Sequence, residues 1–248
     1  MKKIILLFFF ISLVCSGYSQ EDHTKIYISN DLAIVRLTPH VWMHVSWHNS
    51  PQFGRYPSNG MILVNDDEAW LFDTPMTDSL TGALVSWLTY TMRLKIKGFT
   101  PNHWHSDCMG GLAYLQNMRI PSLANQLTIN IAHDKHLPVP DKGFNDSARL
   151  QLGDIDVFCF YPGPAHSTDN IAVWIPSEKV LFAGCMVKSM NAANLGNTTD
   201  GDLSSYPATL TRLLTRFPDA QFVVPGHGTS GGLELIRHTI VLANKAKP

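Results

Sequence analysis

The sequence predicts a single α/β domain built of layers, in which one arrangement of strands and helices occurs twice. Short runs rich in valine, isoleucine and aromatic residues are bounded by turn residues, as expected of strands. Segments with apolar residues at helical spacing follow several of these runs, which favours strands alternating with helices. No glycine- and serine-rich linker interrupts the 248 residues, so we expect one domain rather than two.

The N-terminus predicts an export signal. Lys2 and Lys3 precede a mostly apolar run, and small and polar residues follow it. The run is too short to span a bilayer, and no later segment is apolar enough for a membrane helix. We expect cleavage after Ser19, with lipidation at Cys15 as the less favoured alternative. This gives a signal peptide at 1–19, a domain at 20–248, and a periplasmic protein without stable membrane association.

The first half of the chain predicts several strands and then a helix. Residues 25–60 alternate strand-forming runs with turn residues, and 61–73 form two apolar runs around a turn, which is typical of a hairpin. The spacing of Leu80, Leu84 and Leu88 predicts a helix over 77–92, capped by Thr77 or Asp78. The other elements expected here are strands at 94–103 and 120–125 and helices at 110–118 and 125–136.

The second half repeats this outline. Strand-forming residues at 148–162 lead to a loop, and 171–185 form a second hairpin with its turn at 176–179. Two hairpins, one ending at Asp73 and the other at Cys185, suggest an internally duplicated layered structure. The last elements expected are a helix at 204–217, a strand at 220–228 and a helix at 232–246.

Charge and cysteine content exclude several classes of protein. The formal net charge of -1 offers no basic face to nucleic acid or anionic lipid. Without its signal the chain keeps Cys108, Cys159 and Cys185, an odd number in an oxidising compartment, so at least one thiol is free. A scaffold held by disulfides alone does not fit so few cysteines, whereas metal ligation would explain a free thiol.

Residue types that bind zinc gather in four loops at the ends of predicted strands. His103, His105 and Asp107 are spaced two apart, so in an extended loop their side chains point to one side. A lone histidine or cysteine in such a loop is more often a hydrogen-bonded or packed residue, but this density of ligands has no packing reason. The candidates are enough for two zinc ions with positions open for water: His103, His105, Asp107, His166, Cys185 and His227.

The other histidines and cysteines are expected to have structural roles. Cys159 lies within a strand and should be buried. A disulfide between Cys108 and Cys185 would destroy the candidate site, so a metal site requires both thiols to be reduced. The histidines expected on the surface or in packing are His23, His40, His44, His48, His133, His136 and His238.

Five motifs occur in order behind the signal: HWHSDCMGG, PAHSTDN, GCMVK, NLGN and VPGHG. With them the chain resembles the subclass B1 metallo-β-lactamases over nearly all of its mature length, and it is similar to the chromosomal carbapenemases of Bacteroides-type bacteria. The resemblance implies a four-layer αβ/βα sandwich, in which two mixed sheets pack face to face with helices outside. It also implies two Zn2+ ions per chain and a monomeric protein.

Two cysteines separate this resemblance from the wider superfamily. Relatives such as glyoxalase II-like and lactonase-like hydrolases carry a histidine directly after the motif aspartate and an aspartate that bridges the metals. Cys108 and Cys185 stand at these positions here, which is the B1 pattern. The alternatives are a zinc hydrolase of lactones or thioesters and a metal-binding protein without turnover, the latter disfavoured by Lys188 and Asn197.

The resemblance implies a role for each candidate residue. A hydroxide shared by two zinc ions would hydrolyse the β-lactam amide of penicillins, cephalosporins and carbapenems, and so confer antibiotic resistance. Asp107 would orient the hydroxide, Asn197 would polarise the carbonyl oxygen, and Lys188 would bind the substrate carboxylate. The ligands implied are His103, His105 and His166 for the first zinc, and Asp107, Cys185 and His227 for the second.

Residues outside the ligand set are expected to support it. Asp73 would fix the tautomer of a ligand histidine. Residues 45–56 resemble a mobile flap over the active site, in which Trp47 and Phe53 are candidates to cover an apolar part of the substrate.

Overall fold

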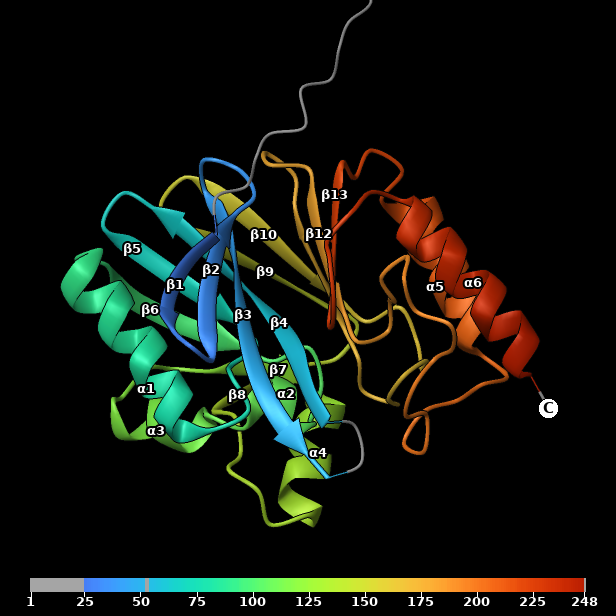
Figure 1. The fold of residues 1–248 in the computed structure, drawn as a ribbon, viewed down its shortest axis with the longest axis horizontal. Coiled ribbons are helices and arrows are strands. Elements are labelled where there is room, and N and C mark those ends of the chain that lie inside the picture. Colours follow the sequence, from blue (N-terminus) through green and yellow to red (C-terminus); the bar gives the residue numbers. More distant parts are fainter. Residues whose placement is uncertain (1–24, 52–53, 248) are drawn as a thin grey trace, which may run out of the picture.

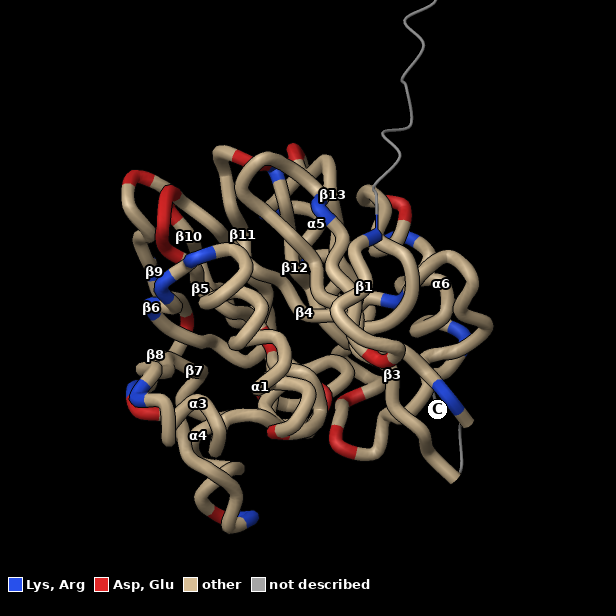
Figure 2. Tube along the Cα trace, turned by 60° about the vertical axis from the view of Figure 1, so that its left-hand side comes forward, with Lys and Arg blue, Asp and Glu red and all other residues tan. Residues whose placement is uncertain are grey.

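The computed structural model describes residues 25–51 and 54–247. The predicted signal peptide, the alternative lipidation site Cys15 and the flap residue Phe53 lie outside these residues. None of the helices in the described part of the chain is both long and apolar enough to cross a bilayer. Along the tube of Figure 2, the positions of Lys and Arg are interspersed with those of Asp and Glu.

The first sheet has six strands that lie side by side in sequence order. Neighbouring strands are antiparallel except β5 and β6, which are parallel. The strands are β1 (Lys25–Ser29), β2 (Leu32–Arg36), β3 (Val41–Ser50), β4 (Gly54–Asn65), β5 (Glu68–Phe72) and β6 (Lys95–Thr100).

The second sheet has five strands in the order β13-β12-β11-β10-β9. Only β12 and β13 are parallel. The strands are β9 (Ser147–Leu152), β10 (Ile155–Phe160), β11 (Ala172–Ile175), β12 (Val180–Gly184) and β13 (Phe222–Pro225).

The predicted duplication is visible in the connections. The hairpin of β4 and β5 is followed by α1 (Asp78–Ser86) with its continuation η1 (Trp87–Thr91), and then by β6, parallel to β5. The hairpin of β11 and β12 is likewise followed by α5 (Tyr206–Arg216) and the parallel β13. A parallel pair needs such a crossover because its strands cannot be joined by a tight turn.

Shorter elements fill the space between the two halves. As predicted, Thr77 caps α1, its hydroxyl accepting a hydrogen bond from the amide of Leu80. Strand β8 was not expected, since three residues give no alternating pattern. The remaining elements are α2 (Ser106–Met109), α3 (Leu112–Asn117), β7 (Leu123–Asn125), α4 (Gln126–Asp134), β8 (Lys142–Phe144) and α6 (Glu234–Ala246).

Figure 1 shows two sheets with helices on the outer side of each, and three apolar clusters lie between these layers. One cluster lies between the sheets, one between the first sheet and α1 with α3, and one between the second sheet and α5 with α6. Strand β12 alternates between two of them: Val180 and Phe182 face the first sheet, and Leu181 and Ala183 face the helices. The predicted αβ/βα sandwich of two mixed sheets is therefore confirmed.

The candidate ligands follow strands that end at one edge of the sandwich. His103 follows β6, Cys185 follows β12, and His227 follows β13. The amide of Ile171 donates to the carbonyl of Asn102 at 2.9 Å, which joins the loop after β6 to the second sheet. The fold thus brings loops of both halves together at this edge.

Candidate metal centre

Three histidines form the first group of possible metal ligands. One nitrogen of each of His103, His105 and His166 lies within 4.8 Å of those of the other two. His103 Nε2 and His105 Nδ1 are 2.9 Å apart. His103 and His166 are buried, and the Nδ1 atom of His166 is a buried polar atom without a hydrogen-bond partner among the described residues. Such a group of neutral imidazoles fits a zinc ion.

Hydrogen bonds orient two of these rings. His105 Nε2 lies 2.9 Å from Asp200 Oδ2, so the carboxylate accepts the ring proton and Nδ1 faces His103. On His103, Nδ1 lies 3.1 Å from Cys108 Sγ and 3.3 Å from Asn102 Oδ1, which leaves Nε2 toward the group. The sequence pattern missed Asp200 because it is 95 residues from His105 and has no characteristic spacing.

Asp107, Cys185 and His227 form the second group. Cys185 Sγ is 3.4 Å from both Asp107 Oδ2 and His227 Nε2, and His227 Nε2 is 3.2 Å from Asp107 Oδ2. Ligand atoms arranged tetrahedrally around zinc stand about 3.3 to 3.8 Å apart, given zinc-to-ligand distances of about 2.0 to 2.3 Å. The three ligand atoms therefore already have nearly the separations that one zinc ion requires.

Asp107 also connects the two groups. Its Oδ2 atom faces Cys185 and His227, while its Oδ1 atom lies 4.0 Å from His103 Nε2. The six predicted ligands thus lie in two adjacent groups of three, as the resemblance implies.

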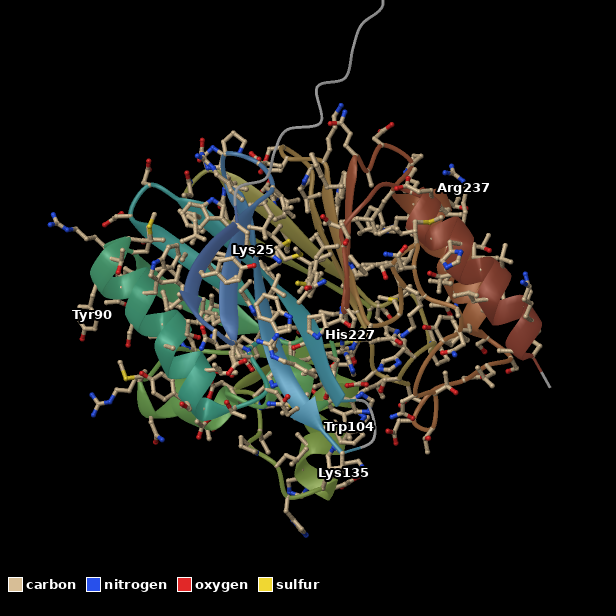
Figure 3. The ribbon with its side chains drawn as sticks, in the orientation of Figure 1. Lys25, Tyr90, Trp104, Lys135, His227 and Arg237 are labelled. Carbon is tan, nitrogen blue, oxygen red and sulfur yellow. The ribbon has the colours of Figure 1, made fainter. Side chains whose placement is uncertain are left out.

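The first sheet holds the loop that carries His227. The ring Nδ1–H donates to the carbonyl of Pro57 at 2.7 Å, which directs Nε2 toward Cys185. Asn59 Nδ2 donates to the carbonyls of Pro225 at 2.9 Å and Gly228 at 2.8 Å. The amide of Asn59 also donates to the carbonyl of Gly226 at 2.8 Å. Figure 3 shows His227 between the two halves of the sandwich.

Gly184 turns the chain so that Cys185 enters the site. Its φ is +56°, a conformation that glycine adopts without strain. A Cβ atom at this position would collide with the side chain of Asn102, which donates to the carbonyl of Ile171. Glycine is therefore required here for both conformation and space.

The second group is charged in the absence of metal. A hydrogen bond from Cys108 lowers the pKa of Cys185 to about 6, against the effect of burial. Burial lowers the pKa of His227, but the Cys185 thiolate and the Asp107 carboxylate outweigh it and raise that pKa well above its usual value. Burial raises the pKa of Asp107, but the hydrogen bond from His227 and the nearby histidines hold it below its usual range. A thiolate, a carboxylate and an imidazolium therefore share this group near neutral pH.

Two rings of the first group, those of His103 and His166, are neutral by contrast. Burial lowers the pKa of His103 to about 3, and burial also lowers the pKa of His166 well below its usual value. Neutral imidazole is the form that binds metal, so these rings need not lose a proton first.

All three described cysteines are free. Cys159 is buried in β10 as predicted, and burial raises the pKa of its thiol to about 12. Cys108 lies beneath the site and offers a sulfur close to His103, Asp107 and Cys185. Burial raises the pKa of Cys108 well above its usual value, so it remains a thiol and is a poorer ligand than Cys185.

A cleft of about 820 Å³ lies over the two groups. Lys188 and Asn197 line it, together with apolar residues from several loops. Lys188 Nζ donates to the carbonyl of Cys185 at 2.8 Å, which fixes the ammonium beside the second group. Asn197 Oδ1 accepts a hydrogen bond from the amide of Thr199 at 3.1 Å, so its NH2 group is the part that can donate to a ligand.

Asp73 has other partners than those we expected. Its carboxylate accepts a hydrogen bond from the amide of Asn102 at 2.5 Å, and among the described residues no ligand histidine bonds to it. The predicted tautomer-fixing role belongs instead to Asp200 for His105. Asp73 follows β5, and its carboxylate reaches the start of the loop that carries the candidate ligands. Asp73 therefore holds the backbone of this loop rather than a ligand ring.

Trp47 lies at the base of the predicted flap. Its ring stacks on Tyr27 with 6.3 Å between ring centroids, and it packs against the cluster between the sheets. From this segment Tyr56 lines the cleft instead, and so does Pro57, which follows it. The expectation that Trp47 covers the substrate is therefore not supported by its position.

The comparisons with known proteins agree with this geometry. A family model described as the metallo-beta-lactamase superfamily matches residues 53–227. The chain is 46% identical over 221 residues to a Bacteroides fragilis protein named metallo-beta-lactamase type 2, and the match covers 89% of each. A protein of the same name from Pseudomonas aeruginosa is 32% identical, over 96% of this chain and 92% of its own. The solved structure of a metallo-beta-lactamase from Pontibacter korlensis matches with a TM-score of 0.83 and 34% identity, over 86% of this chain and 99% of that one.

The substitution Asn59→Ala should weaken the second metal site. It removes two hydrogen bonds that hold the loop around His227, and losing such supporting contacts typically costs about 10- to 100-fold in metal affinity. Competition with a chromogenic chelator measures both zinc affinities. Asn130 is exposed, so Asn130→Ala provides the matched control and should leave both zinc affinities unchanged. If Asn59→Ala bound zinc as tightly as the unaltered protein, Asn59 would not support the second metal site.

Binding of the second zinc should release about one proton near pH 7. Because the pKa of His227 is raised, its ring is protonated in the metal-free protein, whereas the lowered pKa of Cys185 already makes it a thiolate. Calorimetric titration in buffers of different ionisation enthalpy counts the protons. The release should decrease as the pH rises through the pKa of His227, and a release that instead increases there would be inconsistent with this charge state.

Proposed function

Because the chain belongs to the metallo-beta-lactamase superfamily, we propose that it is a subclass B1, zinc-dependent β-lactamase. It hydrolyses the amide bond of penicillins, cephalosporins and carbapenems and so confers antibiotic resistance. The observation that carries this proposal is that two unlike ligand groups and the ammonium of Lys188 share one cleft. This combination places a carboxylate-binding group beside a centre for hydrolysis.

We assign the first zinc to His103, His105 and His166 and the second to Asp107, Cys185 and His227. Bound zinc supplies Lewis acidity, which polarises a carbonyl and brings the pKa of water to about 7. A zinc ion held by neutral ligands remains more Lewis acidic than one held by a thiolate and a carboxylate. The two zinc ions would therefore differ in how strongly they polarise a bound water or carbonyl.

The protein's own side chains orient the substrate. The ammonium of Lys188 pairs with the substrate carboxylate, and the amide NH2 of Asn197 donates to the carbonyl oxygen on which negative charge develops. Asp107 has Oδ1 near His103 and Oδ2 near Cys185 and His227. With Oδ2 directed to the second group, Oδ1 of Asp107 remains available to accept a hydrogen bond from the attacking water and so orient it.

We further propose that the protein acts as a monomer in the periplasm. In this proposal residues 1–19 are a cleavable signal for export and residues 20–248 form a single domain. Both ligand groups, Lys188 and Asn197 come from a single chain, so the site needs no residue from a second copy.

The primary test uses the purified mature chain. It should contain two zinc ions and hydrolyse a carbapenem and a cephalosporin, lose activity with a chelator, and regain it with zinc. Cys185→Ser should bind the second zinc more weakly and lose most activity, since a hydroxyl does not replace a thiolate. Cys159→Ser, altered away from the site, controls for thiol loss. Two bound zincs without hydrolysis of either antibiotic would refute the proposal.

Lys188→Met should raise KM more than it lowers kcat. The change keeps the length of the buried side chain but removes its charge, and a charge-assisted hydrogen bond is worth about 1.5 to 3 kcal/mol, or about 10- to 150-fold. Steady-state kinetics measure the effect, with the exposed Lys179→Met as control. A substrate whose carboxylate is masked as an ester should be insensitive to Lys188→Met; equal sensitivity would show that Lys188 does not bind this carboxylate.

A further inference from the structure

One wall of the cleft combines apolar residues with an exposed cation. Trp104, Leu137 and Pro138 line the same cleft as Lys188. Lys135 Nζ lies 4.3 Å from the centre of the Trp104 ring, a cation–π distance. Figure 3 shows Trp104 and Lys135 on the side of the molecule that carries α4.

The wall directly adjoins the metal centre. The Trp104 ring lies edge-on to the imidazole of His105, with 4.4 Å between ring centroids. A substituent resting on the indole would therefore lie next to the reacting amide rather than in a separate pocket.

Buried hydrogen bonds fix the wall in place. Asp169 is fully buried, and its Oδ2 atom accepts from the amide of Trp104 at 2.9 Å and from Thr128 Oγ1 of α4 at 2.7 Å. Beyond α4, Gln116 Nε2 donates to the carbonyl of Val139 at 2.8 Å. Helix α4 is thus joined through Asp169 to the loop that carries the candidate metal ligands. The loop after α4 is joined to α3 through Gln116.

The charge of Lys135 is not neutralised by a neighbouring acid. Among the described residues no carboxylate forms a salt bridge with it, and the adjacent Asp134 instead lies 3.7 Å from His133 Nδ1. Lys135 therefore presents a positive charge at the rim of an aromatic and aliphatic surface.

From this geometry we propose that Trp104, Leu137, Pro138 and Lys135 form a subsite for the acyl substituent of the substrate, selective for arylacetyl groups that carry a carboxylate beside the ring. This rests on the proposed function. With the carboxylate of the substrate at Lys188 and its amide over the metal groups, the acyl substituent at the other end of the substrate reaches Trp104, which lies beside His105. Its aryl ring packs on Trp104 and Leu137, and a carboxylate on the carbon that bears the ring pairs with Lys135.

The test compares three penicillins that differ only at the α-carbon of a phenylacetyl side chain: unsubstituted, α-carboxy and α-amino. In Lys135→Glu the ratio of kcat/KM for the α-carboxy compound to that for the unsubstituted one should fall about 2- to 10-fold, because an exposed attraction becomes a repulsion. The corresponding ratio of kcat/KM for the α-amino compound to that for the unsubstituted one should rise. Lys179→Glu, the same charge change on the β11–β12 turn, should alter neither ratio.

Salt and zinc measurements distinguish the subsite from structural effects. The Lys135→Glu effect should shrink as ionic strength rises from about 0.01 to about 1 M, where the screening length falls from about 30 to about 3 Å, while zinc content stays unchanged. Leu137→Ser should slow the phenylacetyl compound about 3- to 10-fold relative to the penicillin nucleus without an acyl group.

The possible failures are separable. If the unaltered protein hydrolyses all three penicillins but Lys135→Glu and Lys179→Glu change their ratios equally, the subsite is refuted and the proposed function stands. If the unaltered protein hydrolyses none of them, the proposed function fails and the subsite with it.

Discussion

The hydrogen bonds between the two sheets at one edge are the constraint on which the rest of the site depends. Ligands from the loop after β6 reach those after β12 and β13 only if the two halves of the sandwich meet in register. Asn59 provides this contact by binding the loop on both sides of His227, and Asn102 provides it through Ile171. Apolar burial holds the sheets together, but these directional bonds determine where the ligands lie.

Electrostatics then divide one cluster into two unlike halves. Burial keeps His103 and His166 neutral, whereas the thiolate of Cys185 and the carboxylate of Asp107 hold a proton on His227 in the metal-free protein. His103 in the loop after β6 and Asp107 in the adjoining α2 lie on one short segment, so a small displacement of this segment would affect both halves. Asp73, Asp169 and Asp200, each bonded to this loop, oppose such a displacement.

The strands, the duplication and the convergence of the candidate ligands could be predicted because each leaves a local signal. Alternating apolar residues mark the strands, and dense histidines with an aspartate mark the loop at His103. Asn59, Asp169 and Asp200 leave no such signal: they are common residue types whose partners lie tens of residues away along the chain. Asp73 was recognised as important, but its partner depends on the path of the turn after β5, which the sequence pattern does not specify.

The central claim is that six residues in two groups hold two zinc ions. Crystals of the zinc-loaded protein measured at and below the zinc absorption edge test it most directly. The account predicts two anomalous peaks, one bound by His103, His105 and His166 and the other by Asp107, Cys185 and His227. A single peak, or a peak bound by Cys108 in place of Cys185, would contradict it.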